Sequence, residues 1–444
     1  MNVTSHNSKR ALATIAAIAT SAGCLFGCAS TSRDEGAIPV RDPRPHAGAD
    51  EVEAGDGDES SAEAPWTERA DDADADDADE GAFELDPMVI EVDPETGEGR
   101  VYDPRSLLDA GNEALADGRA REAKAYFDAL VDEFPDSRLS APAQFNKGLA
   151  FEQLGDGDAA IAQYLQLARV ADQGRYAIDA AIRAGAVMAE LGRFAAAADL
   201  FQDLLERSDL SASDRVEAFA RLGYVLYENK RDPEAEEALE EALAVADGLG
   251  EGEYLETNYY VAMAHFYLGM IPRRQFGEIP LRLPDEQLQQ DLDAKAELVL
   301  LAHERFSRAI DVRAPDWATA AGYELGAMQE GFWREIVTAP IPPHLSPRQV
   351  EIYNEEVHRH ALEFLERALN LYKKTVELAE AYRTSTPYSR AARTRAEDVA
   401  DLLARERAGE LVQLEDDEAP SAPVEAPEEA DWDVASYVPS RTEL

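Results

Sequence analysis

The sequence has little cysteine and few basic residues, and each shortage excludes a class of protein. Its 444 residues include only Cys24 and Cys28, so neither a catalytic thiol nor a disulfide framework is expected in the body of the chain. The 42 Lys and Arg residues face 90 Asp and Glu residues, which gives a net charge of −48. We therefore expect no nucleic-acid partner, because phosphate binding needs a basic surface.

Recognisable catalytic motifs are also missing. The chain has no G-x-S-x-G motif, no phosphate-cradling glycine loop and no H-E-x-x-H motif. Seven histidines occur without metal-ligand spacing, and the approach of His265 to His303 on neighbouring predicted helices is better explained as structural. We expect a protein that is not an enzyme and that uses no cofactor, metal or small-molecule substrate.

What the chain does contain is a fourfold pattern of small and bulky residues within residues 105–250. Each copy has a glycine, an alanine twelve residues later and a bulky residue four further on, with a period of 37 or 38 residues. Small residues let antiparallel helices approach closely, and the bulky residue fills the gap between hairpins. Such a period predicts stacked helical hairpins. The copies are Gly111–Ala123–Phe127, Gly148–Ala160–Tyr164, Gly185–Ala197–Phe201 and Gly223–Ala235–Leu239.

The pattern resembles the tetratricopeptide repeat, in which small, aromatic, small and proline positions follow one another, with Pro135 as the proline of the first copy. The later copies lack that proline and are three or four residues longer than usual. The resemblance implies an all-α, right-handed superhelical solenoid. We expect about six hairpins and a capping helix, flanked by disordered acidic tails.

Residues 251–408 continue the array as two interrupted hairpins. The first is predicted to have a helix over 256–268 with Ala262 at the small position, a turn at Leu268-Gly269, a 28-residue insertion and a helix over 287–312. The second is predicted to have helices over 317–337 and 348–383 around a proline-rich loop. Pro387 opens the capping helix, because proline is favoured in the first helical turn.

The amino-terminal residues 1–28 read as a signal peptide, with Lys9-Arg10 before a short apolar stretch. Leu25-Phe26-Gly27-Cys28 resembles a bacterial lipobox, so Cys28 is the predicted lipidation site and Cys24 the alternative. Residues 29–104 form a predicted acidic, disordered tether, and residues 409–444 a similar tail. Lipoprotein sorting rules then favour the periplasmic face of the outer membrane, with the acyl group as the only membrane contact. An ordinary cleaved signal remains open.

Partner binding is predicted on the concave face of the solenoid, which the first helix of each hairpin lines. The tetratricopeptide resemblance also gives Glu152, Gln153, Glu190 and Glu228 as groove positions. A cluster rich in tyrosine has the composition of an interface hot spot. The residues predicted to bind the partner are Asn112, Phe145, Tyr224, Tyr227, Tyr259, Met263, Phe266 and Tyr267.

Together these features resemble tetratricopeptide lipoproteins of the adventurous-gliding-motility type, especially at Trp317–Tyr323 and at the proline-rich loop over 337–343. That resemblance implies a scaffold or adaptor that binds envelope proteins or peptides in a cell-envelope complex. An assembly or pilotin factor for a secretin or an outer-membrane barrel is one alternative. A peptidoglycan-binding protein or envelope enzyme is another.

Overall fold

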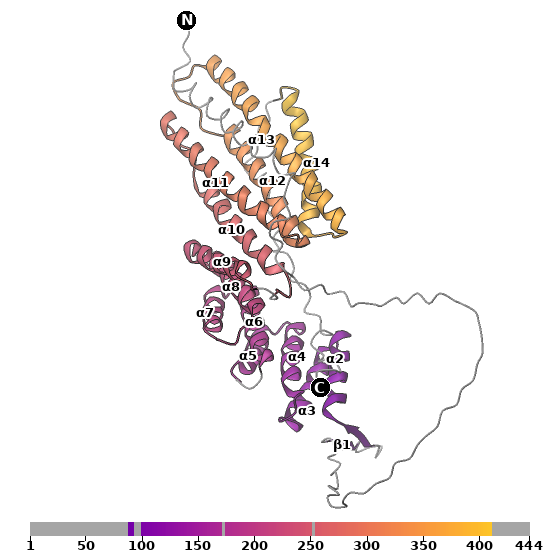
Figure 1. Cartoon of the computed structure of the whole chain (residues 1–444). Helices are drawn as coiled ribbons and strands as arrows, with labels where there is room; N and C mark the ends of the chain where they lie inside the picture. The colour runs from indigo at the N-terminus through magenta and orange to yellow at the C-terminus, as the bar shows by residue number, and fades with distance from the viewer. Residues whose placement is uncertain (1–87, 93–98, 171–173, 251–253, 411–444) are drawn as a thin grey trace, which may run out of the picture.

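The structure, a computed structural model, describes residues 88–92, 99–170, 174–250 and 254–410. This part of the chain is nearly all helical, with thirteen helices and one two-stranded hairpin. The helices stack as consecutive hairpins from α2 at one end to α13 and α14 at the other (Figure 1). The predicted all-α solenoid is confirmed.

Six hairpins make up the stack, and α14 (Pro387–Arg407) follows them. Their first helices are α2 (Pro104–Ala116), α4 (Ser140–Gln153), α6 (Arg175–Glu190), α8 (Ala212–Glu228), α10 (Tyr259–Glu278) and α12 (Pro315–Val337). Their second helices are α3 (Ala120–Glu133), α5 (Gly157–Ala168), α7 (Phe194–Leu205), α9 (Asp232–Asp247), α11 (Asp285–Asp311) and α13 (Pro347–Tyr382).

The first helices of consecutive hairpins touch one another along the whole stack, from α2 against α4 to α10 against α12. Helix α14 packs on both α12 and α13, so it takes the position that a seventh first helix would occupy. The first helices therefore form a continuous inner layer, which is the surface that a stacked hairpin array offers to partners.

The predicted glycine–aromatic contacts hold the regular hairpins together. A Cβ atom added to Gly111 would lie 2.3 Å from the Phe127 ring, and one added to Gly148 would lie 2.3 Å from the Tyr164 ring. Both rings are fully buried. The glycine is needed because the ring of the second helix lies directly on the backbone of the first.

The long hairpins correct the prediction for residues 251–408. Helix α10 does not end at Leu268 but continues through Pro272 to Glu278, so the 28-residue insertion mainly lengthens the two helices. Gly269 is not part of a turn: a Cβ atom there would lie 2.6 Å from the Phe306 ring. Gly269 therefore occupies the small position that the sequence analysis gave to Ala262. Burial of Ile271 and Phe276 on both sides of the proline stabilises the continued helix.

Residues 29–104 were predicted to be a disordered tether, with residues 83–92 and Val101-Tyr102 as either a short motif or a lead-in to the first helix. Strands β1 (Val89–Val92) and β2 (Gly99–Tyr102) pair as an antiparallel hairpin just before α2. β-branched residues favour an extended backbone, and both strands contain them. Most of the predicted tether, all of the predicted signal peptide and the tail after residue 410 lie outside the described residues.

Candidate protein-binding site

Where the regular and the long hairpins meet, aromatic side chains from four helices of the inner layer come together. We call this set the junction cluster. It draws on α8, α10, α12 and α14, which are consecutive in the inner layer. Its members are Tyr224, Tyr227, Tyr259, Phe266, Tyr267, Trp317, Tyr323 and Tyr388.

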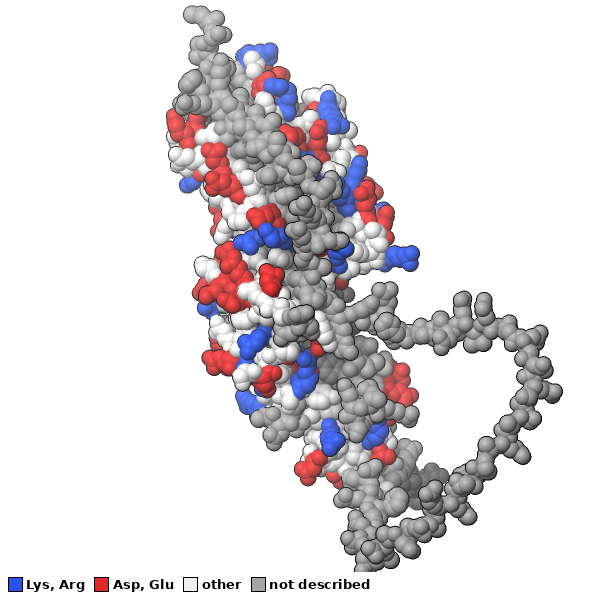
Figure 2. All heavy atoms as spheres, viewed as in Figure 1, with Lys and Arg blue, Asp and Glu red and all other residues white. Residues whose placement is uncertain are grey.

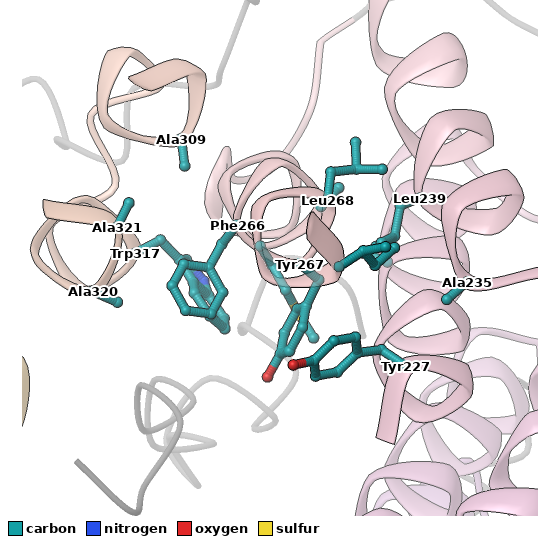
Figure 3. Close-up of a cluster of buried hydrophobic side chains, with 14 of the residues drawn as sticks. Tyr227, Ala235, Leu239, Phe266, Tyr267, Leu268, Ala309, Trp317, Ala320 and Ala321 are labelled. Carbon is teal, nitrogen blue, oxygen red and sulfur yellow. The ribbon is translucent and has the colours of Figure 1, made fainter. Parts of the chain in front are cut away.

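Ring contacts link the cluster from end to end. The Tyr267 ring centroid lies 5.0 Å from that of Tyr224, 5.5 Å from that of Tyr227 and 5.8 Å from that of Trp317. Phe266 lies 5.1 Å from Trp317, and Figure 3 shows its ring against the indole. These separations are in the range that aromatic pairs prefer. The cluster is thus one connected set of aromatic rings, most of them buried, with the half-buried Tyr224 and Tyr259 at its exposed side.

Tyrosine hydroxyls give the cluster a polar edge. In Figure 3 the hydroxyl groups of Tyr227 and Tyr267 point toward the same space. Burial raises the pKa of Tyr267 well above its usual value, and it raises the pKa of Tyr227 as well. Burial also raises the pKa of Tyr323 to about 12. All three hydroxyls are therefore neutral at physiological pH and can both donate and accept hydrogen bonds.

Two arginines of α10 border the cluster. The Arg274 guanidinium stacks 3.8 Å from the centre of the Tyr227 ring, donates to the Tyr227 carbonyl at 2.8 Å and pairs with Asp232. The Arg273 Nε atom lies 3.2 Å from a carboxylate oxygen of Glu324, which is buried in α12. Burial raises the pKa of Glu324, and Arg273 opposes that shift. The cluster therefore combines aromatic faces, neutral hydroxyls and charges held by partners.

The structure brings five of the eight predicted residues into the junction cluster and places three elsewhere. Asn112 is nearly buried and accepts a 2.7 Å hydrogen bond from the Asn146 amide. The ring centroid of Phe145 lies 5.3 Å from that of Tyr164, and the Met263 side chain of α10 is buried in the hydrophobic core. These three residues therefore pack between helices, and the role of all eight in partner binding stays a prediction. Side chains three or four residues apart on a first helix lie on one face, and that face packs against the first helix of the next hairpin.

Burial is also deeper than predicted within the cluster. Phe266 and Tyr267 are 2% and 4% exposed, whereas Tyr224 and Tyr259 are half-buried. The half-buried rings are consequently the better probes of partner binding, because truncating Phe266 would open a cavity between Phe306 and Trp317.

Sequence analysis missed Trp317, Tyr323 and Tyr388 as members of the site. All three lie on α12 or α14, which were treated as an interrupted repeat and a cap. Their place in the repeat order could have identified them, because each lies on an inner-layer helix. Helix α12 packs on α10, which contains predicted residues, and α14 packs on α12. Assigning α14 to a first-helix position would have added Tyr388.

Two groove residues predicted from the early repeats, Glu152 and Gln153, make polar contacts between consecutive first helices. Glu152 of α4 accepts hydrogen bonds from the Tyr164 hydroxyl at 2.6 Å and from Arg183 of α6. Hydrogen bonds and the nearby Glu152 charge raise the pKa of Arg183, against the opposing effect of its burial, and the guanidinium stays charged. Gln153 donates to the Leu115 carbonyl at 3.0 Å. These side chains tie consecutive first helices together and already have their partners.

Cys24 and Cys28 lie outside the described residues, so the predicted lipidation stays a prediction. Among the described helices we find none whose length and apolar character would suit a membrane crossing. In the same part of the chain no group of three or more His, Cys, Asp and Glu side chains is arranged to hold a metal ion.

Comparison with known proteins gives a family for the regular hairpins. The tetratricopeptide repeat family matches residues 108–176 and 187–250, so the chain contains tetratricopeptide repeats. A tetratricopeptide repeat protein from Parabacteroides merdae ATCC 43184 is 14% identical, with 68% of this chain and 98% of that chain covered and a TM-score of 0.32. The human IFIT1 dimer with m7Gppp-AAAA is 13% identical, with 70% and 72% covered and a TM-score of 0.30. No curated protein sequence matches.

Proposed function

We propose that this chain, which carries tetratricopeptide repeats, is a non-enzymatic scaffold that captures a segment of a partner protein at the junction cluster. One observation carries the proposal: aromatic rings from four inner-layer helices form one connected set, from which the half-buried rings of Tyr224 and Tyr259 reach the surface. Tyrosine and tryptophan are enriched in binding hot spots because they offer large contact areas with few rotatable bonds. Tetratricopeptide arrays in general bind proteins through this layer.

The proposal extends to the setting in which the scaffold acts. Acylation of Cys28, or of Cys24 in its place, would hold the chain at the periplasmic face of the outer membrane. The acidic segment that follows would let the solenoid reach away from the lipid surface. In this setting the partner is a protein of a cell-envelope complex, such as a motility machine.

Capture from crosslinked envelopes tests the site. The double variant Tyr224→Ala with Tyr259→Ala removes two half-buried rings, and we expect at least about a tenfold loss of captured partner, as for hot-spot truncation. The matched control is Tyr126→Ala, a half-buried tyrosine on α3, which is a second helix. Circular dichroism checks that helicity is retained. Equal capture by the double variant and the wild type contradicts the site, and so does an equal loss in the control.

Fractionation of cells tests the anchor separately. Cys28→Ser should move the protein from the membrane fraction to the soluble fraction, whereas Cys24→Ser should leave it at the membrane. The reverse result assigns lipidation to Cys24. If neither variant moves the protein, the anchor proposal fails, while the capture result stands on its own.

The identity of the captured protein then decides among envelope roles. Components of a motility or envelope-spanning machine support the proposed scaffold. A secretin or a barrel-assembly protein would instead indicate an assembly factor. Retention on purified cell-wall sacculi would indicate peptidoglycan binding.

A further inference from the structure

The long fifth hairpin extends past its shorter neighbour and leaves a ledge. Near the end of α10, Arg274 already contacts the last turn of α8 and pairs with Asp232, the first residue of α9. Arg305 of α11 forms ion pairs with Glu236 and Glu240 of α9. The part of α10 after Arg274 and the part of α11 before Arg305 therefore lie beyond the α8–α9 turn, and Figure 1 shows both helices continuing past it.

On the side of the ledge that faces the preceding hairpin, α8 and α9 do not reach far enough to cover α10 and α11. A groove lies there, between the end of α10 and α11. Its volume is about 490 Å³. Ala294, Leu298 and Leu301 are spaced three or four residues apart, so they lie on one face of α11. The complete lining, which we call the ledge groove, is Gln275, Glu278, Ile279, Ala294, Glu297, Leu298 and Leu301.

The floor of the ledge groove is apolar and its rim is acidic. Leu301 is 40% exposed, and Leu298 and Ile279 are half-buried. Glu278 and Glu297 are exposed, and the lining contains no basic residue. The cations next to the groove, Arg274 and Arg305, are ion-paired with carboxylates of α9. A ligand that covers the leucines therefore meets uncompensated negative charge at the rim.

We propose that the ledge groove binds a basic amphipathic helix of a partner protein. Along the rest of the fifth hairpin, α8 and α9 cover this face, so the free part has the shape that accepts another helix. Leucine or isoleucine at positions i, i+3 or i+4 and i+7 of the partner covers the apolar floor, as in other helix-in-groove complexes. Lysine or arginine beside them faces Glu278 and Glu297.

The negative charge at the rim disfavours two other possible occupants of the ledge groove, the chain's own acidic segments and a second copy of the chain. The chain's own segments over 33–99 and 409–444 have net charges of −20 and −10, so the glutamates of the rim repel them. A second copy of the chain, docked groove to groove by two-fold symmetry, would bring Glu278 and Glu297 against the same two residues. A basic helix is the occupant that both the floor and the rim favour. This site is independent of the junction cluster.

The test uses the full chain and a fluorescein-labelled amphipathic peptide of about 14 residues with leucine on one face and lysine on the other. Fluorescence anisotropy is measured in about 0.15 M salt, which screens long-range attraction. We expect Leu301→Asp, and separately Glu278→Lys with Glu297→Lys, to weaken binding at least about tenfold, the effect of losing one buried leucine contact.

Matched controls separate the ledge groove from the general acidity of the chain. Leu300→Asp changes a neighbouring leucine that is 38% exposed but does not line the groove. Glu237→Lys with Glu241→Lys makes the same charge change on exposed positions of α9. Both controls should bind within about twofold of the wild type, because they leave the groove intact.

Several results overturn the proposal. The peptide could fail to bind, a glutamate version of it could bind equally well, or the controls could lose as much affinity as the groove variants. A wild-type dimer in light scattering that Leu301→Asp converts to a monomer would instead assign the groove to a second copy of the chain. Circular dichroism establishes that each variant is folded before its binding is compared.

Discussion

At the scale of single residues, the glycines where paired helices cross carry a clear stability prediction. A Cβ atom at Gly148 would lie 2.3 Å from a ring carbon of the fully buried Tyr164. Gly148→Ala forces the ring or the helices apart, and we expect it to lower the free energy of unfolding by about 2 kcal/mol. Urea denaturation followed by circular dichroism measures the change.

Gly331→Ala supplies the control for that substitution. Gly331 also lies inside a helix, but a Cβ atom there meets nothing within 4 Å. The methyl group should therefore raise the free energy of unfolding by about 0.5–1 kcal/mol through helix propensity alone. A similar loss in both variants would show that steric contact with Tyr164 is not the cause.

Two histidines of the fifth hairpin make stability depend on pH. Burial, with smaller effects of Arg308 and Arg305, lowers the pKa of His265 to about 4, and burial lowers the pKa of His303 to about 4. In the unfolded chain each titrates near 6.5. As pH falls from 6.5 to 4 the unfolded state takes up protons that the folded state does not, so the free energy of unfolding falls, by at most about 2 kcal/mol per histidine at pH 5.

Urea denaturation at pH 7 and pH 5 tests this contribution. The double variant His265→Gln with His303→Gln should lose less stability between the two pH values than the wild type does. His344→Gln, at an exposed histidine, should follow the wild type. An unchanged pH dependence in the double variant would mean that the two imidazoles are not held neutral by the fold.

Residue patterns predicted the regular hairpins well and the fifth one badly. The glycine and aromatic positions of the first three repeats make the expected contacts, and their alanines are fully buried. In the fifth hairpin the pattern Gly269, Ala302 and Phe306 is also present, but the longer helices separate its parts. The regular repeat length therefore placed the small residue of the helix crossing at Ala262 instead of Gly269. Only the packing of Gly269 against Phe306 identifies the crossing.

At the scale of elements, α14 closes the end of the long hairpins. Arg395 pairs with the fully buried Glu330, and His358 lies 2.9 Å from Glu406. A chain that ends at Arg383 removes Arg395 from Glu330, which keeps Arg334 at 3.6 Å and the Tyr372 hydroxyl at 3.0 Å, and it uncovers Phe266 and Tyr323. Because α12 and α13 lose this ion pair together with the buried apolar contacts of Tyr388, Val399 and Leu403, we expect them to lose stability by roughly 3–5 kcal/mol.

Hydrogen exchange read by mass spectrometry measures that loss element by element. Peptides from α12 and α13 should exchange faster in the truncated chain, whereas peptides from α2 to α7 should keep their protection. The single variant Arg395→Met, which keeps the helix, should show a smaller loss in the same peptides. Unchanged exchange in α12 would mean that α14 does not stabilise the end of the stack.

The elements themselves could be predicted except where tertiary packing overrides local preference. Helix α13 begins at Pro347, within one residue of the predicted start, because Ser346 and Gln349 form a capping box there. Helix α10 was predicted too short, because Leu268-Gly269 was interpreted as the turn between the two helices, and a proline soon after it usually ends a helix. Pro272 is instead buried inside α10, where neighbouring apolar contacts outweigh the missing hydrogen bond.

At the scale of the whole molecule, the junction cluster was only half predictable. Repeat positions of α8 and α10 pointed to Tyr224, Tyr227 and Tyr267, which share one face of the inner layer. Tyr388 joins them from a helix more than one hundred residues later in the chain. Because such a contact depends on how consecutive hairpins rotate about the solenoid axis, the sequence periodicity does not contain it.

We expect local unfolding of the solenoid to begin at its first hairpin. One apolar cluster extends from Ala141 in the second hairpin to Leu403 in α14, whereas the first hairpin belongs to a smaller cluster that it shares with Ala143 and Ala150 of α4. An end repeat has a neighbour on one side only, so its opening needs less free energy than opening of the middle. We expect amides of α2 and α3 to exchange with a free energy several kcal/mol below that of α8 to α11.

The two ends of the stack should also behave differently, because α14 and its ion pairs close only the far end. The amides of α12 and α13 should accordingly exchange nearly as slowly as those of the middle, and truncation at Arg383 should make both ends open early. Native-state hydrogen exchange over a range of denaturant concentrations distinguishes these patterns. Equal protection of α2 and α10 would contradict the expected order, since it would require the whole solenoid to unfold as one unit.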